Sequence, residues 1–400
     1  MHNTGLSTRW CAALTAAFVS FVSVPFLGSL FGWDFCRYVG ENRTLSACPS
    51  FSFATVRAFP QGFEAFYKDR FGFRNAFIRG QSILTHKWLM LSSSQVILGK
   101  DGWLYLTRNK AVDDFAGQNL FDSSHLSYFR LILKGRQAWL ARRGIKYLFV
   151  VVPDKRTIYP EYLPDYILRA KGRTRLEQLS DYMRDDPGVN FLDLTEVLRA
   201  GKSGGRLFYR DDDHWTPRGK FVGCEAIRER LAEWFPGMRP WRLEDYRIGY
   251  QPEKPDLLAL LGTATASAYM CERLDPKAPP QSRRVKLTLP GDFIIPQKWT
   301  GRLNAATENK AARGKLVVFS DSFLTTAFDS DSLLPLTENF RRLVFLDMRT
   351  DYRTMKSIVE QEHPDAVVEE WAQYMLEVPP DHPEWDLARE ASLQSGASPR

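Results

Sequence analysis

The chain has 400 residues, which is enough to bury a full hydrophobic core in one large domain or two smaller ones. Hydrophobic residues make up 44% of it and charged residues 25%, which excludes a disordered or fibrous protein. The net charge of +7 is spread along the sequence without a long run of like charges, so no nucleic-acid partner is expected and a solvated, mildly basic surface is the simplest interpretation.

The N-terminal segment predicts a membrane-spanning helix. No charged residue lies between Arg9 and Asp34, and this uncharged stretch exceeds the roughly 20 residues that a bilayer-spanning helix needs. We expect residues 1–9 in the cytoplasm and residues 10–33 as an uncleaved signal anchor in the inner membrane. A cleaved signal peptide is the alternative, because Ala and Ser are frequent here. An exported chain with this anchor is periplasmic.

Residues 34–93 predict a helical linker region. The chain from about residue 41 is amphipathic and carries a dense aromatic stripe, for which packing is the expected role. Residues 94–106 then predict a β-hairpin, because the turn Lys100-Asp101-Gly102 separates two apolar runs.

Short apolar strands alternate with amphipathic helices after the hairpin. The alternation predicts an α/β fold, in which a mainly parallel sheet of the SGNH-hydrolase-like kind carries helices on both faces. We expect this domain over residues 94–376, with an irregular, β-containing insertion at about residues 237–310 and a disordered tail over residues 377–400. The expected strands are 146–152, 189–194, 315–319, 343–347 and 365–369.

The five cysteines are compatible with export. Cys36 and Cys48 are near enough in sequence to close a disulfide loop in an oxidising compartment. Cys224 falls on the apolar face of a predicted helix and is expected in the core. No pair of cysteines has metal-ligand spacing and the six histidines are scattered, so neither a metal nor a cofactor is predicted.

Polar residues follow the strand at 315–319 abruptly, as Ser320-Asp321-Ser322-Phe323. Ligands of doubly wound sheets bind beyond the carboxyl ends of the strands. A serine there, at the start of a helix, exposes its hydroxyl near backbone N–H groups that are suited to stabilising an oxyanion. Taken alone, the segment fits a helix-capping serine better than a nucleophile.

A second polar segment, Asp211-Asp212-Asp213-His214-Trp215-Thr216, changes that balance. Residues two apart in an extended chain point the same way, so Asp212 and His214 are expected side by side. A carboxylate in that place fixes the imidazole tautomer and stabilises the imidazolium formed in catalysis. We therefore predict a triad of Ser322, His214 and Asp212. The alternatives are aspartates that cap the next helix, and a metal site, which the lack of a nearby second histidine disfavours.

Several short motifs occur in a fixed order between about residues 41 and 371. They are Glu41-Asn42-Arg43, Phe71-Gly72-Phe73-Arg74-Asn75, Leu98-Gly99-Lys100-Asp101-Gly102-Trp103-Leu104-Tyr105, Val152-Pro153-Asp154-Lys155, Tyr159-Pro160-Glu161-Tyr162-Leu163-Pro164, Asp212-Asp213-His214-Trp215-Thr216 and Asp321-Ser322-Phe323. Their number, order and spacing resemble the alginate O-acetyltransferase family with an SGNH hydrolase-like domain, the AlgJ/AlgX type.

The resemblance implies transfer of acetyl groups to hydroxyls of an exported polysaccharide, alginate or a similar polymer. It maps the aspartate and histidine of the family's Asp-x-His-Trp-Thr motif onto Asp212 and His214, and the serine of its Gly-Asp-Ser-Phe motif onto Ser322. It also implies a membrane-bound O-acyltransferase as the acetyl donor. Ser320 stands where the family motif has glycine. No segment resembles the carbohydrate-binding module of the AlgX type, so the sequence is closer to the membrane-anchored AlgJ type.

Acetyl transfer through an acetyl-serine requires the acceptor sugar to outcompete water, so an aromatic-lined groove is expected beside the triad. Candidates for the groove are Trp103, Tyr105, Trp215 and Trp299, each with a core position as its alternative. Lys155 and Tyr159 follow a strand end and are further candidates for shaping the substrate site.

Two other functions are compatible with the same residues. A polysaccharide acetyl esterase would use the same triad with water as the acceptor. A non-catalytic scaffold that presents polysaccharide to an acetylation complex is the second alternative, and the serine at position 320 gives it some support.

Overall fold

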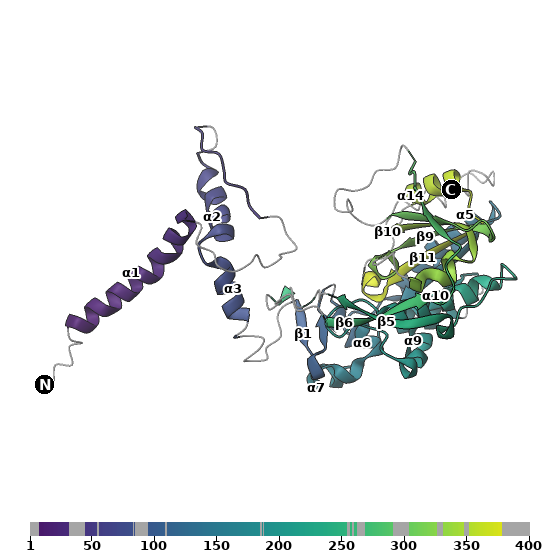
Figure 1. Cartoon of the computed structure of the whole chain (residues 1–400), viewed down its shortest axis with the longest axis horizontal. Helices are drawn as coiled ribbons and strands as arrows, with labels where there is room; N and C mark the ends of the chain where they lie inside the picture. Colours follow the sequence, from purple (N-terminus) through teal and green to yellow (C-terminus); the bar gives the residue numbers. More distant parts are fainter. Residues whose placement is uncertain are drawn as a thin grey trace. The chain divides into compact units, whose positions relative to one another are not determined.

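The computed structural model describes residues 8–31, 45–53, 56–82, 84, 95–108, 110–184, 186, 188–253, 257, 260–261, 269–290, 304–325, 331–347 and 352–377. The chain divides into two compact units, Met1–Val96 with Pro255–Ser267, and Ile97–Lys254 with Ala268–Arg400 (Figure 1). Cys36, Trp299 and the tail predicted from residue 378 onward lie outside the described residues, so the disulfide and the disordered tail stay predictions.

The first unit begins with an apolar helix, α1 (Thr8–Phe31). Its stretch Trp10–Ser29 has a mean hydropathy of 1.9 and is long enough to cross a membrane. Most of its large apolar side chains are exposed, which suits a helix surrounded by lipid better than a helix in a protein core.

Two further helices, α2 (Phe59–Arg70) and α3 (Arg74–Ser82), lie in the region predicted to be helical. The bend between them packs closely on α1, since the Gly72 amide donates a 3.0 Å hydrogen bond to the Pro25 carbonyl. A Cβ atom at Gly72 would lie 2.5 Å from the carbonyl carbon of Gly28, so this contact requires glycine.

The predicted hairpin is present as β1 (Val96–Leu98) and β2 (Leu104–Leu106), which pair around the turn Lys100–Gly102. Asp101 and Gly102 have φ angles of 52° and 74°, the left-handed conformation that Asp and Gly tolerate best.

The second unit is built on a sheet of seven strands in the order β4-β3-β11-β9-β10-β8-β7. The first five strands are parallel and the last two are antiparallel to their neighbours. This confirms the predicted α/β fold. The strands are β3 (Lys146–Val152), β4 (Phe191–Asp193), β7 (Arg283–Val285), β8 (Ala305–Glu308), β9 (Arg313–Ser320), β10 (Phe340–Asp347) and β11 (Ala366–Ala372).

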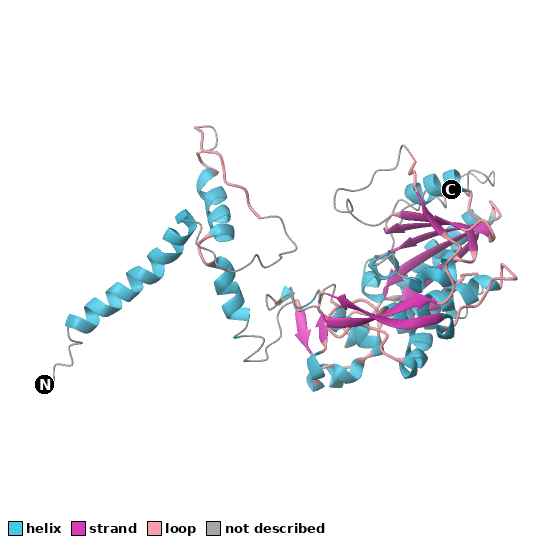
Figure 2. Ribbon diagram, in the orientation of Figure 1, coloured by secondary structure: helices cyan, strands magenta, loops and turns pink. Residues whose placement is uncertain are grey.

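Helices cover both faces of this sheet (Figure 2). Alternate residues of β3 belong to two separate cores, with Phe149 in one and Val150 in the other. The Phe149 face is covered by α5 (Ser123–Ala141), α8 (Arg175–Arg184) and α14 (Tyr352–Glu362). The Val150 face is covered by α6 (Lys155–Ile158), α9 (Thr195–Gly201), α10 (Pro217–Ala232), which carries the buried Cys224, and α13 (Leu334–Thr337). Short helices occur at α4 (Ala111–Phe115), α7 (Asp165–Arg169) and α12 (Ser322–Thr325).

The predicted insertion at 237–310 is corrected by the structure. Only β5 (Tyr246–Glu253) and β6 (Tyr269–Pro276) form a separate antiparallel pair. Strands β7 and β8 from the same stretch extend the main sheet, with Ala306 of β8 paired to Val344 of β10. Strands β7 and β8 have only three and four residues, so no periodic pattern marks them in the sequence.

Candidate active site

The candidate nucleophile lies at the carboxyl edge of the parallel strands. Strand β9 ends at Ser320, and Ser322 begins the short helix α12. The intervening Asp321 is buried, and its carboxylate accepts hydrogen bonds of 2.8 Å from the backbone amides of Phe323 and Ala372. These bonds fasten the Ser322 turn to the end of β11.

The candidate base lies in a tight loop between two hydrogen-bonded segments. Phe208 and Trp215 form an isolated antiparallel bridge. The Tyr209 amide donates to the His214 carbonyl at 3.1 Å, and the Thr216 amide donates to the Leu207 carbonyl at 2.8 Å. The bonds hold residues 209–214 as one closed turn. Thr216 also caps α10, so the loop is fixed to that helix.

The structure brings the three predicted triad residues together. The Nε2 atom of His214 lies 2.9 Å from Ser322 Oγ, and its Nδ1 atom lies 2.7 Å from Asp212 Oδ1. Asp212 Oδ1 also accepts the backbone amide of His214 at 2.8 Å, which fixes the carboxylate relative to the ring. A carboxylate can only accept at Nδ1–H, so Nε2 carries the lone pair that faces the Ser322 hydroxyl.

The electrostatics of this pair suit a general base. Burial alone would raise the pKa of Asp212, but the hydrogen bonds and charge of His214 outweigh it and hold that pKa below its ordinary value. Burial alone would lower the pKa of His214, but the hydrogen bond and charge of Asp212 outweigh it and raise that pKa. Asp212 is therefore ionised near neutral pH, and His214 is a stronger base than a free imidazole.

Lys155 is buried and contacts the backbone of the loop that carries Asp212. Its Nζ atom is buried and donates to the carbonyls of Leu104 at 2.6 Å, Arg210 at 2.9 Å and Asp212 at 2.9 Å. An ammonium group has three N–H donors, and all three are used here. Burial lowers the pKa of Lys155 to about 7. The structure thus replaces the predicted substrate contact with a bracing role for the loop that holds Asp212.

Trp215 joins the two halves of the site. Its indole N–H donates a 2.6 Å hydrogen bond to the carbonyl of Phe323, and the two rings meet edge to face at 5.6 Å. The Phe323 ring also lies 5.3 Å from the ring of His214. Trp215 is only 2% exposed. Trp215, predicted to line a substrate groove, thus connects the loop that carries His214 to the turn that carries Ser322.

The other aromatic candidates that the structure describes are likewise buried, whereas Trp299 lies outside the described residues. Trp103 stacks on Tyr162 at 4.4 Å, and the hydroxyl of Tyr105 donates to the Tyr159 carbonyl at 2.7 Å. The Tyr159 hydroxyl accepts the Leu207 amide at 2.9 Å. Trp103, Tyr105 and Tyr159 are 3%, 0% and 6% exposed, respectively. Their sequence positions beside the motifs reflect support of the site from within the core, and not contact with a substrate.

A buried carboxyl pair, not predicted from the sequence, lies next to the nucleophile. The Asp321 amide donates to Glu370 Oε2 at 3.2 Å, and both side chains are buried. Burial raises the pKa of Asp321 to about 6. Burial and the charge of Asp321 raise the pKa of Glu370 well above its ordinary value. Burial therefore favours the protonated form of both groups.

A sequence signal for this pair exists in β11. Two adjacent glutamates, Glu369 and Glu370, interrupt an otherwise apolar strand, and neighbouring strand residues point to opposite faces. Glu369 is paired with Arg136 in one core and accepts the Tyr147 hydroxyl at 2.6 Å. Glu370 faces Asp321 in the other. Among the described residues, no group of three or more His, Cys, Asp or Glu side chains is arranged to hold a metal ion.

Comparison with known proteins shows which proteins these features resemble. Residues 96–287 match the family model described as "SGNH hydrolase-like domain, acetyltransferase AlgX". A probable alginate O-acetylase AlgJ of Pseudomonas aeruginosa is 30% identical over 201 residues, which are 47% of this chain and 46% of that protein. The chain spans about half the length of the curated relatives it matches.

One solved structure supports the same fold. Bacillus cereus PatB1, in a structure with a sulfonyl adduct, matches with a TM-score of 0.51 at 15% identity, over 72% of this chain and 98% of that chain. The O-acetyltransferase domain of Pseudomonas putida AlgJ matches with a TM-score of 0.48 at 17% identity, over 76% and 99% of the two chains. The family-model match and the curated relatives confirm the resemblance to the AlgJ/AlgX type of SGNH hydrolase-like proteins.

Proposed function

We propose that this chain is an O-acetyltransferase that acetylates hydroxyls of an exported polysaccharide through an acetyl-Ser322 intermediate. The observation that carries the proposal is the unbroken hydrogen-bonded series from Ser322 through His214 to Asp212. Its curated relatives are named probable alginate O-acetylases, which supports alginate or a similar polymer as the acceptor.

In the first half-reaction, Ser322 Oγ forms a bond to the carbonyl carbon of an acetyl donor. The hydroxyl proton moves to His214 Nε2, 2.9 Å away, and Asp212 stabilises the resulting imidazolium. The bond between the acetyl group and the donor then breaks, and the leaving group takes the proton from His214. Acetyl-Ser322 and a neutral imidazole remain.

In the second half-reaction, the same nitrogen takes the proton of a sugar hydroxyl. The sugar oxygen bonds to the acetyl carbon, and Ser322 Oγ leaves and regains the proton from His214. The partly buried Asp212 remains ionised throughout, so one histidine serves as base and then acid in each half-reaction.

We further propose that α1 anchors the protein in the inner membrane with the SGNH-like domain in the periplasm, as predicted from the sequence. The apolar stretch Trp10–Ser29 supports the anchor. A membrane-bound O-acyltransferase is the proposed acetyl donor, because an acetyl group destined for a periplasmic polymer has to cross the membrane.

The full-length protein in detergent, given a chromogenic acetyl ester and oligomers of mannuronate, tests the proposal. Intact-mass and peptide mass spectrometry locate the acetyl group, and Ser322→Ala and His214→Ala are compared with wild type. Ser320→Ala is the matched control, because the Ser320 hydroxyl is buried and makes no hydrogen bond among the described residues.

Acetyl-Ser322 and acetylated sugar, both absent from the two triad variants and retained in Ser320→Ala, are the expected results. Ester turnover without sugar acetylation would instead assign an esterase. Absence of turnover and of an acetyl adduct in the wild type would leave the polysaccharide scaffold as the better description.

A further inference from the structure

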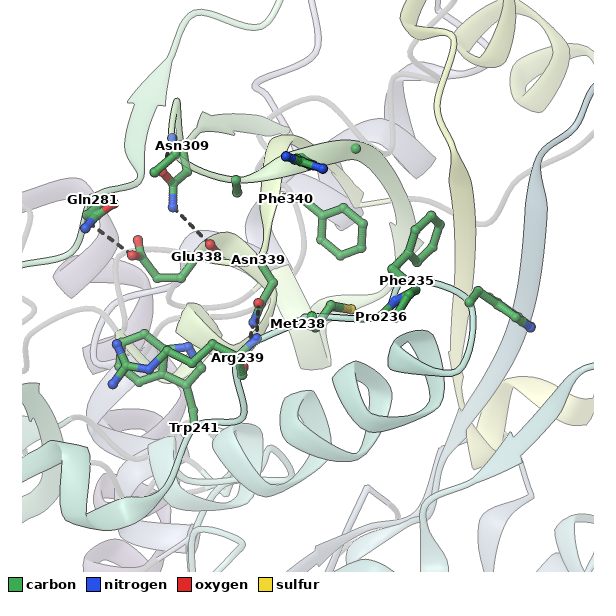
Figure 3. Close-up of a pocket in the computed structure, with 16 residues that line it drawn as sticks. Phe235, Pro236, Met238, Arg239, Trp241, Gln281, Asn309, Glu338, Asn339 and Phe340 are labelled. Carbon is green, nitrogen blue, oxygen red and sulfur yellow. Dashed lines mark hydrogen bonds between the residues drawn. The ribbon is translucent and has the colours of Figure 1, made fainter.

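A cavity of about 650 Å³ lies in the SGNH-like unit, away from the triad (Figure 3). It is bordered by the starts of β9 and β10, by the turn after β8 and by the segment that follows α10. Ser322 follows the opposite end of β9. That strand has eight residues, so at about 3.3 Å per residue the cavity and the nucleophile are about 25 Å apart.

Aromatic side chains supply much of the cavity lining. Phe235 and Phe340 meet edge to face at 5.7 Å, and Trp241 also borders the space. Trp234 and Phe235 are only partly buried, so part of each ring remains available to a ligand. Partly exposed aromatic faces in a concave site bind the apolar faces of flat or ring-shaped ligands.

The wall of the cavity is held in place by hydrogen bonds that use its other polar groups. Asn309 donates to the Glu338 carbonyl at 2.9 Å, and Asn339 exchanges hydrogen bonds of 2.7 and 2.9 Å with the backbone of Arg239. The Glu338 carboxylate accepts the amide of Gln281 at 3.1 Å. Figure 3 shows these bonds around the space. The cavity is thus a built feature of the fold, and its wall amides and carboxylate are already occupied.

Positive charge and unused donors remain for a ligand. The exposed guanidinium of Arg313 makes no hydrogen bond or ion pair with the described residues. Arg239 lies over the Trp241 ring at 4.4 Å, and its guanidinium donates a 3.1 Å hydrogen bond to Asp245. The Trp241 indole N–H is buried and has no partner in the described part of the chain. An arginine fork beside an aromatic surface is suited to a carboxylate carried on an apolar ring.

We propose that this cavity is a second, non-catalytic subsite that binds an acidic sugar ring of the polysaccharide. Arg313 contacts the carboxylate, and the partly exposed rings of Trp234 and Phe235 pack against the apolar face of the sugar. The identity of the polymer, an acidic polysaccharide, rests on the proposed function, whereas the site rests on the cavity itself. A polymer long enough to reach about 25 Å is then held at both edges of the sheet, which raises its local concentration at Ser322.

The test uses the full-length protein in detergent. Calorimetry measures binding of a mannuronate oligomer and of a neutral mannose oligomer of equal length. Arg313→Gln removes the unpaired charge, and Ala311→Trp fills the space from an exposed turn position on its border. Arg142→Gln is the matched control, since it removes an exposed arginine outside the cavity lining.

We expect Arg313→Gln to weaken binding of the acidic oligomer by about tenfold, as for loss of a charge-assisted hydrogen bond, and Ala311→Trp to abolish binding at this site. The control should bind like wild type. Turnover of the chromogenic ester should be unchanged in all three variants. The KM for long polymannuronate should rise in the two cavity variants, while the KM for a dimer, too short to span the two sites, should not.

Wild-type binding of the acidic oligomer by both cavity variants would overturn the inference, as would equal affinity for the neutral oligomer. The proposed transferase function is tested separately, by whether Ser322 becomes acetylated. Failure of Ser322 to become acetylated, together with oligomer binding that depends on Arg313, would refute the transferase and leave the subsite standing.

Discussion

The indole N–H of Trp215 donates a hydrogen bond to the backbone carbonyl of Phe323 at 2.6 Å. Each of these residues immediately follows a member of the candidate triad, one after His214 and the other after Ser322. The bond therefore ties two loops that are far apart in the sequence, at the point where base and nucleophile must be within 3 Å of each other.

Loss of this bond should impair catalysis more than stability. In Trp215→Phe the ring remains but the donor is lost, so we expect about a tenfold fall in kcat for a chromogenic acetyl ester, equivalent to about 1.4 kcal/mol, and a fall of about 1 kcal/mol in the free energy of unfolding. Trp241→Phe is the control, because its indole N–H has no partner among the described residues. Equal effects of the two changes on kcat would contradict the role of the Trp215–Phe323 hydrogen bond in positioning His214 and Ser322.

The pH dependence of turnover should report His214. The base must be neutral to accept a proton, and Asp212 raises its pKa, so kcat/KM should rise with pH with a midpoint above 6.5. In Asp212→Asn the charge is lost and burial dominates, so the midpoint should move to lower pH while kcat falls by roughly 10³- to 10⁴-fold. An unmoved midpoint in a pH–rate profile would mean that Asp212 does not control the titration of His214.

Lys155 should be essential for activity although its hydrogen bonds go to backbone carbonyls and not to a triad side chain. Lys155→Met removes a donor from the buried carbonyl of Leu104 and from the partly buried carbonyls of Arg210 and Asp212. We therefore expect at least a hundredfold loss of kcat and about 3 kcal/mol lower free energy of unfolding. Lys202→Met is the comparison, since Lys202 also donates to a carbonyl, that of Ile158 at 2.8 Å, but is only partly buried. Kinetics and urea unfolding of the two variants measure the difference. Near-wild-type activity of Lys155→Met would refute the bracing role.

The buried carboxyl pair should make stability fall as pH rises. The folded pKa of Asp321, about 6, lies above its unfolded value, and the pKa of Glu370 is raised as well. Their stabilising contribution is therefore complete below about pH 4 and is lost as pH rises through about 6 and beyond. Glu370→Gln keeps the shape without the charge, so urea unfolding between pH 5 and 8 should show a smaller decline than in wild type.

Glu369→Gln is the matched comparison for that experiment. The same substitution one residue earlier breaks the buried pair with Arg136 and should destabilise the protein by about 3–5 kcal/mol. Identical pH profiles for the Glu370→Gln variant and the wild type would show that Glu370 does not titrate in this range.

The sequence predicted the parallel sheet and grouped Ser322, His214 and Asp212 because each lies in a polar segment that abruptly follows an apolar one. Spacing of two within an extended segment was enough to place Asp212 beside His214. The sequence did not reveal which side chains of the motif segments are buried in the core and which could face a substrate. Trp103, Tyr159 and Lys155 lie near the motifs, but their burial depends on contacts between segments far apart in the chain. Strand β8 was missed for a related reason, since its pairing with β10 and β7, and not its own sequence, defines it.

The position of β11 in the sheet has a consequence for the order of assembly. It comes after β3, β9 and β10 along the chain, yet it lies between β3 and β9. Strands β3 and β9 cannot take their native positions on either side of β11 until Ala366–Ala372 has been synthesised and inserted between them. Non-local pairing of this kind is slow. Asp321 also depends on it, because it accepts the amide of Ala372. During synthesis, the turn that carries Ser322 would therefore remain unassembled until Ala372 is in place, so Ser322 lacks its native position in the unfolded chain.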